Sequence, residues 1–245
     1  MNRRVTLAVA ARVLTQLRRD HRTLAMLLVV PCVLITLLWW MFQDLPGGIF
    51  DRFGPALLAL FPFIIMFLVT SVTTLRERSS GTLERLLAMP MGKGDFLLGY
   101  ALAFGLVATV QALLAVALSV GLLGLDVAGP VWLLGLVAVV DAVLGTALGL
   151  FVSAFAATEF QAVQFMPAVV LPQLLLCGLF VPRSAMPGVL EAISNVLPLS
   201  YAVDAMQTLT HSSEVGDVWR DLGIVVAFVL GGLALGAATL RRRTP

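Results

Sequence analysis

The chain has 245 residues, of which 60% are hydrophobic and only 12% are charged, about half the charged share of a soluble domain. With a mean hydropathy of +1.00, this composition excludes a soluble or a disordered protein. Two cysteines are too few for a disulfide framework or a cysteine-rich metal module, and a net charge of +2 gives no indication of nucleic-acid binding. The sequence therefore predicts an all-α integral membrane protein.

Residues 1–22 are predicted to form a basic segment at the membrane interface, with a helix over residues 5–22. Apolar side chains recur in this helix at helical spacing, and arginines lie on another face. The two sets are Leu7, Ala10, Ala11, Leu14 and Leu17, and Arg4, Arg12 and Arg19. Such a helix suits the cytoplasmic surface of a membrane, with lipid as its partner. The alternative is that the arginines act only as a topology signal.

Six stretches approach the roughly 20 apolar residues that a membrane-spanning helix needs. They are Thr23–Phe42, Phe53–Leu75, Phe96–Leu123, Val131–Ala157, Phe165–Val181 and Leu222–Leu240. The fifth is short and contains two prolines. The first is expected to be a retained helix rather than a cleaved signal peptide, because its basic leader is long and no small-residue cleavage site follows it.

A short cytoplasmic helix is predicted within residues 76–95, between the second and third spans. Thr82 and the serines before it offer capping oxygens, three leucines share one face, and Pro90 ends the helix. This arrangement would leave Glu84 and Arg85 available to a cytosolic partner. The alternative is an ordinary connecting loop, although such a loop needs only a few residues.

Residues 182–221 are predicted to lie outside the cell and to contain two short helices that do not cross the membrane. The first would begin at Pro187 and carry apolar residues at helical spacing as far as Pro198, which would break it. The second would be capped by Ser200. Because neither helix is long enough to span, we expect both to lie on the membrane or to dip into it.

The distribution of basic residues predicts that both termini are cytoplasmic. With this orientation, 13 basic residues lie inside and three lie outside, as the positive-inside rule requires. The inside group comprises six residues within 1–22, four within 76–95 and three at 241–243. Eight acidic residues lie outside.

No catalytic or metal site is predicted in this chain. A phosphate-binding loop is absent, since the nearest string at residues 91–94 lacks the first glycine and the hydroxyl residue. His21 and His211 lie on opposite sides of the predicted membrane, so they cannot share a site. Cys32 and Cys177 are expected to be buried thiols.

Asp141 is the one carboxylate predicted well inside a span, where a charge is costly and usually marks function or a polar partner. Gln111 and Gln173 on neighbouring spans are candidate hydrogen-bond partners. Three interpretations stay open: a structural hydrogen bond, a place on a substrate or ion pathway together with the two glutamines, and a contact between subunits.

Two stretches resemble the signatures of a known family. Residues 77–90 read ERSSGTLERLLAMP and are similar to the pattern E-x-x-x-G-T-x-E-x-L-x-x-x-P. The second signature lies around and after the fifth span, at Glu159, Gly178, Pro182, Pro198, Tyr201 and Gln207. With the order of spans and short helices, these motifs resemble the permease subunit of a type-2 ABC transporter, close to the drug-export permeases of the daunorubicin-resistance kind.

The resemblance implies a single transmembrane domain over residues 1–245 in the bacterial cytoplasmic membrane. A second permease, identical or homologous, and two copies of a cytoplasmic ABC ATPase would be its partners, and no nucleic acid is implied. ATP and Mg would bind to the ATPase, so this chain would carry no cofactor. The helix at about 82–89 would couple the two proteins, through Glu77, Gly81, Thr82, Glu84, Arg85, Leu86 and Pro90.

The implied function is export of an apolar or amphipathic, drug-like molecule. Export of a lipid, glycolipid or polysaccharide is the alternative within transport, because related permeases handle such cargoes and the spans do not discriminate. A membrane anchor or assembly factor that transports nothing is an alternative of another class. A pore is disfavoured, since three of the spans have almost no polar stripe.

The arginine distribution predicts that single cysteines placed at residue 2 and at residue 243 will be protected from a membrane-impermeant thiol reagent in intact cells. Both should react once the membrane is opened. A cysteine at residue 214, in the predicted outer segment, is the matched control and should react without permeabilisation. Labelling of either terminus in intact cells would contradict the predicted topology.

Overall fold

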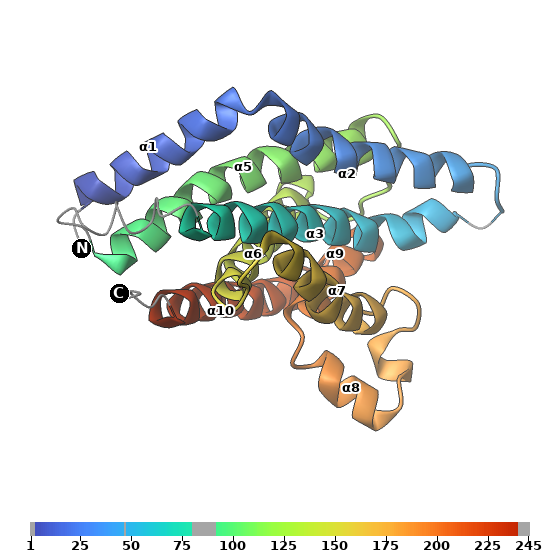
Figure 1. Ribbon diagram of the computed structural model, residues 1–245. Coiled ribbons are helices and arrows are strands. Elements are labelled where there is room, and N and C mark those ends of the chain that lie inside the picture. Colours follow the sequence, from blue (N-terminus) through green and yellow to red (C-terminus); the bar gives the residue numbers. More distant parts are fainter. Residues whose placement is uncertain (1–2, 47, 80–91, 240–245) are drawn as a thin grey trace.

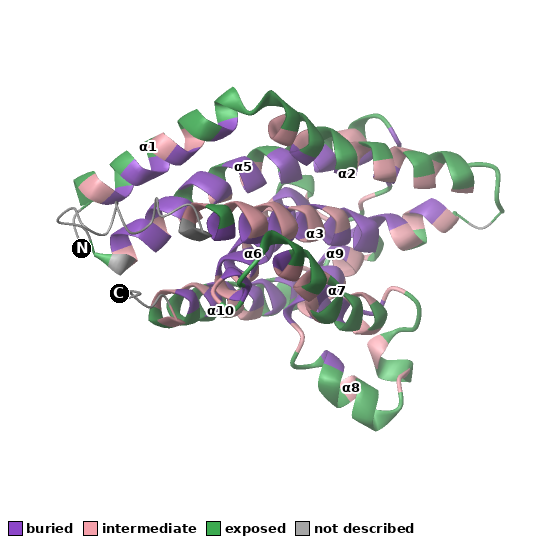
Figure 2. Ribbon diagram, in the orientation of Figure 1, coloured by how far each residue is buried: buried purple, intermediate pink, exposed green. Residues whose placement is uncertain are grey.

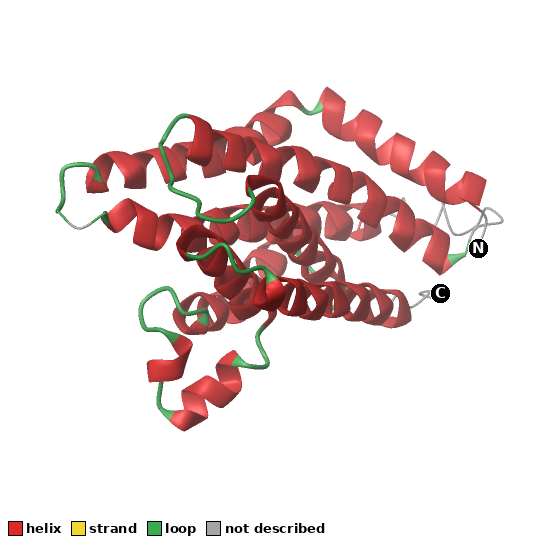
Figure 3. Ribbon diagram, turned by 180° about the vertical axis from the view of Figure 1, so that it is seen from behind, coloured by secondary structure: helices red, strands yellow, loops and turns green. Residues whose placement is uncertain are grey.

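The computed structural model describes residues 3–46, 48–79 and 92–239, and all regular secondary structure within them is helical (Figures 1 and 3). The elements are α1 (Arg3–Arg19), α2 (His21–Phe42), α3 (Ile49–Ser79), α5 (Lys93–Gly121), α6 (Val131–Ser153), α7 (Glu159–Leu176), the 3-10 turn η1 (Arg183–Ala185), α8 (Gly188–Ser194), α9 (Pro198–His211) and α10 (Gly216–Thr239).

Six helices in the described ranges, α2, α3, α5, α6, α7 and α10, are long and apolar enough to cross a membrane. The predicted all-α fold with six spans is therefore confirmed. The fifth span lies earlier in the chain than residues 165–181, because α7 begins where the Thr158 hydroxyl accepts a hydrogen bond from the Gln161 backbone N–H at 3.2 Å. Helix α7 ends before Gly178, whose backbone φ of +92° lies in a region that glycine adopts more readily than other residues.

Helix α6 lies at the centre of the bundle, and α3, α5 and α10 pack around it (Figures 1 and 2). In its most apolar stretch 72% of the residues are buried, compared with 17% in α2 and in α7. The latter two helices are therefore peripheral, with faces open to lipid or to another chain.

Close approach of α6 to α3 depends on two glycines one helical turn apart. A Cβ atom added to Gly149 would lie 2.6 Å from the Phe67 carbonyl oxygen, and one added to Gly145 would press against the Phe63 carbonyl. Small residues at this spacing allow two membrane helices to pack backbone against backbone. The two glycines thus set the distance between the central helix and its most extensive partner.

Helix α1 packs along α5 through a stripe that differs in part from the predicted apolar face. Val9, Val13 and Leu17 are buried, whereas Leu7 and Ala11 of the predicted face are exposed. The difference arises because Gly99 of α5 leaves space for the Val9 side chain, which brings the two helices together along that line. The interfacial position of α1 stays a prediction.

A single residue, Asp20, separates α1 from α2 and caps the second helix. The Thr23 hydroxyl and backbone N–H donate hydrogen bonds to its carboxylate at 2.6 and 3.1 Å. These hydrogen bonds lower the pKa of Asp20, because they favour the charged form.

The two outer helices take different positions. Helix α9 is buried among α3, α6 and α10, whereas α8 projects from the bundle (Figures 1 and 2). The expectation that Ser200 caps the second helix is wrong: α9 starts at Pro198, whose fixed φ suits a first helical turn. Ser200 lies within that turn, fully buried, with its hydroxyl 3.1 Å from that of Ser194.

We predict that Gly145→Ala destabilises the protein by about 1–3 kcal/mol, because the added methyl forces α6 away from the α3 backbone. Helix propensity alone would favour alanine by up to about 1 kcal/mol. Gly231→Ala in α10 is the matched control, since nothing lies within 4 Å of its added Cβ. Thermal unfolding in detergent should show a loss for the first variant only, and equal melting temperatures would refute the packing argument.

Candidate functional site

The C-terminal end of α3, which is predicted to be cytoplasmic, is joined to α1 through Glu77. Nη2 of Arg12 donates to both carboxylate oxygens, at 2.9 and 3.2 Å, and Gln16 donates to one of them at 3.2 Å. The Glu77 side chain is only 13% exposed, so this ion pair is shielded from solvent in part. Glu77 is the predicted coupling residue that the structure describes.

The neighbouring residue joins the same helix end to α7. Arg76 binds Glu159 through two parallel hydrogen bonds, from Nε at 2.9 Å and from Nη2 at 3.0 Å. Because successive residues on a helix point about 100° apart, Arg76 and Glu77 reach different neighbours. Glu159, a predicted signature residue, therefore has a definite partner, and the end of α3 is fixed on two sides.

The start of α5 is joined to α1 as well. The Thr6 hydroxyl donates to Asp95 at 3.2 Å, and the other Asp95 oxygen accepts from the Gly92 backbone N–H at 3.2 Å. Helix α1 thus contacts the chain on both sides of residues 80–91. The other predicted coupling residues fall outside the described residues: Gly81, Thr82, Glu84, Arg85, Leu86 and Pro90.

Asp141 is completely buried in α6, and neither of its carboxylate oxygens has a hydrogen-bond partner among the described residues. The expectation that Gln111 or Gln173 binds it is wrong. Gln111 donates to the Leu27 carbonyl at 2.9 Å, and Gln173 donates to its own helix and accepts from α9. Asp141 therefore makes no side-chain hydrogen bond within the described part of the chain, and its place on a substrate pathway or at a contact between subunits stays a prediction.

Both glutamines satisfy backbone groups that helix geometry leaves unpaired. Pro31 has no N–H, so the Leu27 carbonyl four residues before it lacks its helical donor, and Gln111 supplies one. The Leu199 N–H lies in the first turn of α9, where backbone donors have no helical acceptor, and the Gln173 side chain accepts it at 3.3 Å. These bonds fix α2 to α5 and α9 to α7.

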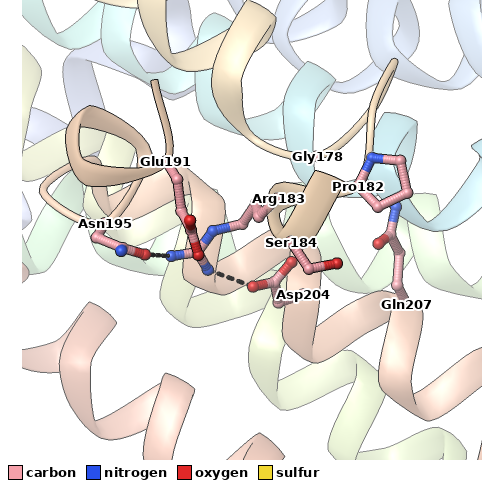
Figure 4. A pocket seen from close by; sticks show the side chains of 8 residues that line it. All are labelled: Gly178, Pro182, Arg183, Ser184, Glu191, Asn195, Asp204 and Gln207. Carbon is pink, nitrogen blue, oxygen red and sulfur yellow. Dashed lines mark hydrogen bonds and ion pairs between the residues drawn. The ribbon is translucent and has the colours of Figure 1, made fainter. Parts of the chain in front are cut away.

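Several of the signature residues that follow α7 lie near Arg183, which was not among the predicted site residues. Its guanidinium forms an ion pair with Asp204 and donates to the Asn195 side chain (Figure 4). It also lies 4.8 Å from the centre of the Tyr201 ring. The Tyr201 hydroxyl in turn donates to the Asn195 carbonyl at 2.7 Å. One available signal was that Arg183 is among only three basic residues predicted outside.

A cavity of about 330 Å³ opens beside this cluster, between the end of α7, η1, α8 and α9. Burial raises the pKa of Asp204, and the charge of Arg183 opposes that shift. The cavity is also lined by three signature residues, Gly178, Pro182 and Gln207. A fourth, Pro198, is the first residue of α9. The complete lining is Gly178, Pro182, Arg183, Ser184, Glu191, Asn195, Asp204 and Gln207.

Six helices long and apolar enough to span a membrane thus form one bundle, in which polar contacts join α1 to α3 and α5, and α3 to α7. The sequence profile of the ABC-2 type transporter family matches residues 4–210, and the chain belongs to this family.

Several characterised proteins are similar to the chain. The probable multidrug ABC transporter permease YbhR of Escherichia coli (strain K12) is 28% identical over 192 residues, which cover 77% of this chain and 52% of YbhR. The inner membrane transport permease YhhJ of the same strain is 28% identical over a stretch that covers 74% of this chain and 48% of YhhJ. ABC transporter G family member 20 of Dictyostelium discoideum is 26% identical over a stretch that covers 75% of this chain and 25% of that protein. The chain spans about half the length of the bacterial relatives it matches.

We predict that Asp141→Asn leaves folding intact, with a melting temperature equal to or above that of the wild type. The substitution removes a buried ionisable group and breaks no hydrogen bond among the described groups. Thermal unfolding in detergent measures this effect, and Gln111→Leu is the contrasting variant. It should destabilise by about 1–3 kcal/mol, because it leaves the Leu27 carbonyl unpaired in the membrane. A large loss of stability in Asp141→Asn would indicate a partner for the carboxylate.

Proposed function

We propose that the chain is the membrane-spanning permease of an ATP-driven ABC exporter, powered by a separate ATPase. The observation that carries the proposal is the attachment of α1 to both flanks of residues 80–91, through Glu77 and Asp95. Membership of the ABC-2 type transporter family and similarity to proteins named as multidrug ABC transporter permeases support it. The cargo would be an apolar or amphipathic, drug-like molecule.

Coupling would begin at the cytoplasmic connection between α3 and α5. A force applied there by the ATPase would move the end of α3 and the start of α5, and α1 would follow both. The Arg76–Glu159 pair would carry the same displacement to α7. Since α7 is peripheral and largely unburied, its movement would change the face that this chain offers to a second permease.

The proposed assembly contains two permeases and two copies of the ATPase, which would hold ATP and Mg. The largely unburied faces of α2 and α7 leave room for the second permease and for lipid. The proposed location is the bacterial cytoplasmic membrane with both termini inside, which the arginine distribution supports. No catalytic role is proposed for the chain itself.

We predict that reversing both charges, Glu84→Arg with Arg85→Glu, lowers ATP-dependent transport and substrate-stimulated ATPase activity by about tenfold or more. Misplaced charges at a protein interface commonly cost at least about 1.4 kcal/mol. The measurement uses permease and ATPase reconstituted in vesicles, with a panel of fluorescent amphipathic dyes and labelled lipids as cargo.

Reversal of Glu214, in the outer segment, is the matched control and should leave coupling unchanged. Membrane insertion of the double variant should equal that of the wild type. Normal transport by the double variant would show that this segment does not couple the two proteins. Absence of transport of every cargo by the wild-type assembly would favour the anchor interpretation.

A further inference from the structure

The outer cavity has an unequal balance of charge. It is lined by one arginine and two carboxylates, and Arg183 is already paired with Asp204. Figure 4 shows this guanidinium between Asn195 on one side and Asp204 on the other, which take its two terminal nitrogens, while its buried Nε has no hydrogen-bond partner among the described residues. The remaining carboxylate, Glu191, leaves the cavity with one net negative charge.

Three polar side chains in the lining, including Glu191, are available to a ligand. The Glu191 carboxylate, the Ser184 hydroxyl and the Gln207 amide make no side-chain hydrogen bond or ion pair with other described residues. All three can accept hydrogen bonds, and they come from three elements, α8, η1 and α9. A ligand in the cavity would therefore find acceptors contributed by three elements.

We propose that this cavity binds the ammonium group of a small organic cation, with Glu191 as its counter-ion. A protonated amine provides up to three N–H donors and one positive charge, which match the free acceptors and the charge of the cavity. One free carboxylate is too few for a calcium ion, which takes six to eight oxygen ligands. An anion would be repelled by the Glu191 charge, since the charge of Arg183 is already balanced by Asp204.

The edge of the cavity indicates that the cation is amphipathic. Phe180 and Val181 directly precede Pro182 of the lining, and they are 56% and 45% exposed. An apolar group attached to the amine could cover these side chains while the ammonium stays inside.

The test uses the full chain in lipid nanodiscs and a probe of defined charge. The probe is 2-[4-(trifluoromethyl)phenyl]ethylamine, protonated at neutral pH, and the corresponding alcohol is its uncharged analogue. Fluorine NMR titration measures binding of each, with empty nanodiscs to subtract partition into lipid. We expect saturable binding of the amine, at least about tenfold tighter than binding of the alcohol.

Glu191→Gln should reduce affinity for the amine by about tenfold and leave that for the alcohol unchanged, since it removes the charge and keeps the shape. Glu214→Gln is the matched control, because Glu214 is an exposed outer acid that does not line the cavity. It should bind the amine as the wild type does. If Glu191→Gln does not fold, Gln207→Met should weaken amine binding about threefold through loss of one acceptor.

Three results would overturn the proposal. They are equal affinity for amine and alcohol, unchanged amine binding in Glu191→Gln, and an equal loss in Glu191→Gln and Glu214→Gln, which would show a diffuse surface field. The inference does not depend on ATP-driven export, because the chain is tested without an ATPase. Failure of either idea can therefore be recognised separately.

Discussion

The structure depends on the requirement that backbone polar groups inside a membrane find partners within the protein. Pro31 leaves a carbonyl of α2 without its helical donor, and the first turn of α9 leaves a backbone N–H without a helical acceptor. A glutamine from another helix pairs with each of these groups. These two side chains hold a peripheral span and a short buried helix in place. The two buried glutamines are thus explained by the backbone groups that they bind, whereas Asp141 is not.

The same bundle separates two chemically different ends. At one end, an ion pair and a hydroxyl hydrogen bond connect α1 with the end of α3 and the start of α5. At the other end, Arg183 ties η1 to α8 and α9 beside a cavity. The glycine contacts of α6 keep the middle of the bundle closely packed. Forces applied at one end would thus reach the other through helices that are held against each other.

Much of the fold could be predicted from the sequence, because span length and hydropathy are local properties. Six spans, the short outer helices and the helix before the first span follow from them. The prediction of the buried face of α1 was wrong in part, because that face depends on Gly99 of another helix. The predicted partners of Asp141 were wrong because both glutamines instead bind backbone groups of other helices. Arg183 was missed because its partners, Asn195 and Asp204, are brought to it only by the tertiary fold.

The single residue between α1 and α2 gives α1 a pivot at Asp20. Thr6 lies 14 residues from this pivot and Arg12 lies eight, which correspond to about 21 and 12 Å along a helix. If α1 tilts about Asp20, the contact with Asp95 would move nearly twice as far as the contact with Glu77. A single rotation would therefore shear the start of α5 against the end of α3, so the geometry of the α1–α2 corner would set the ratio of the two displacements.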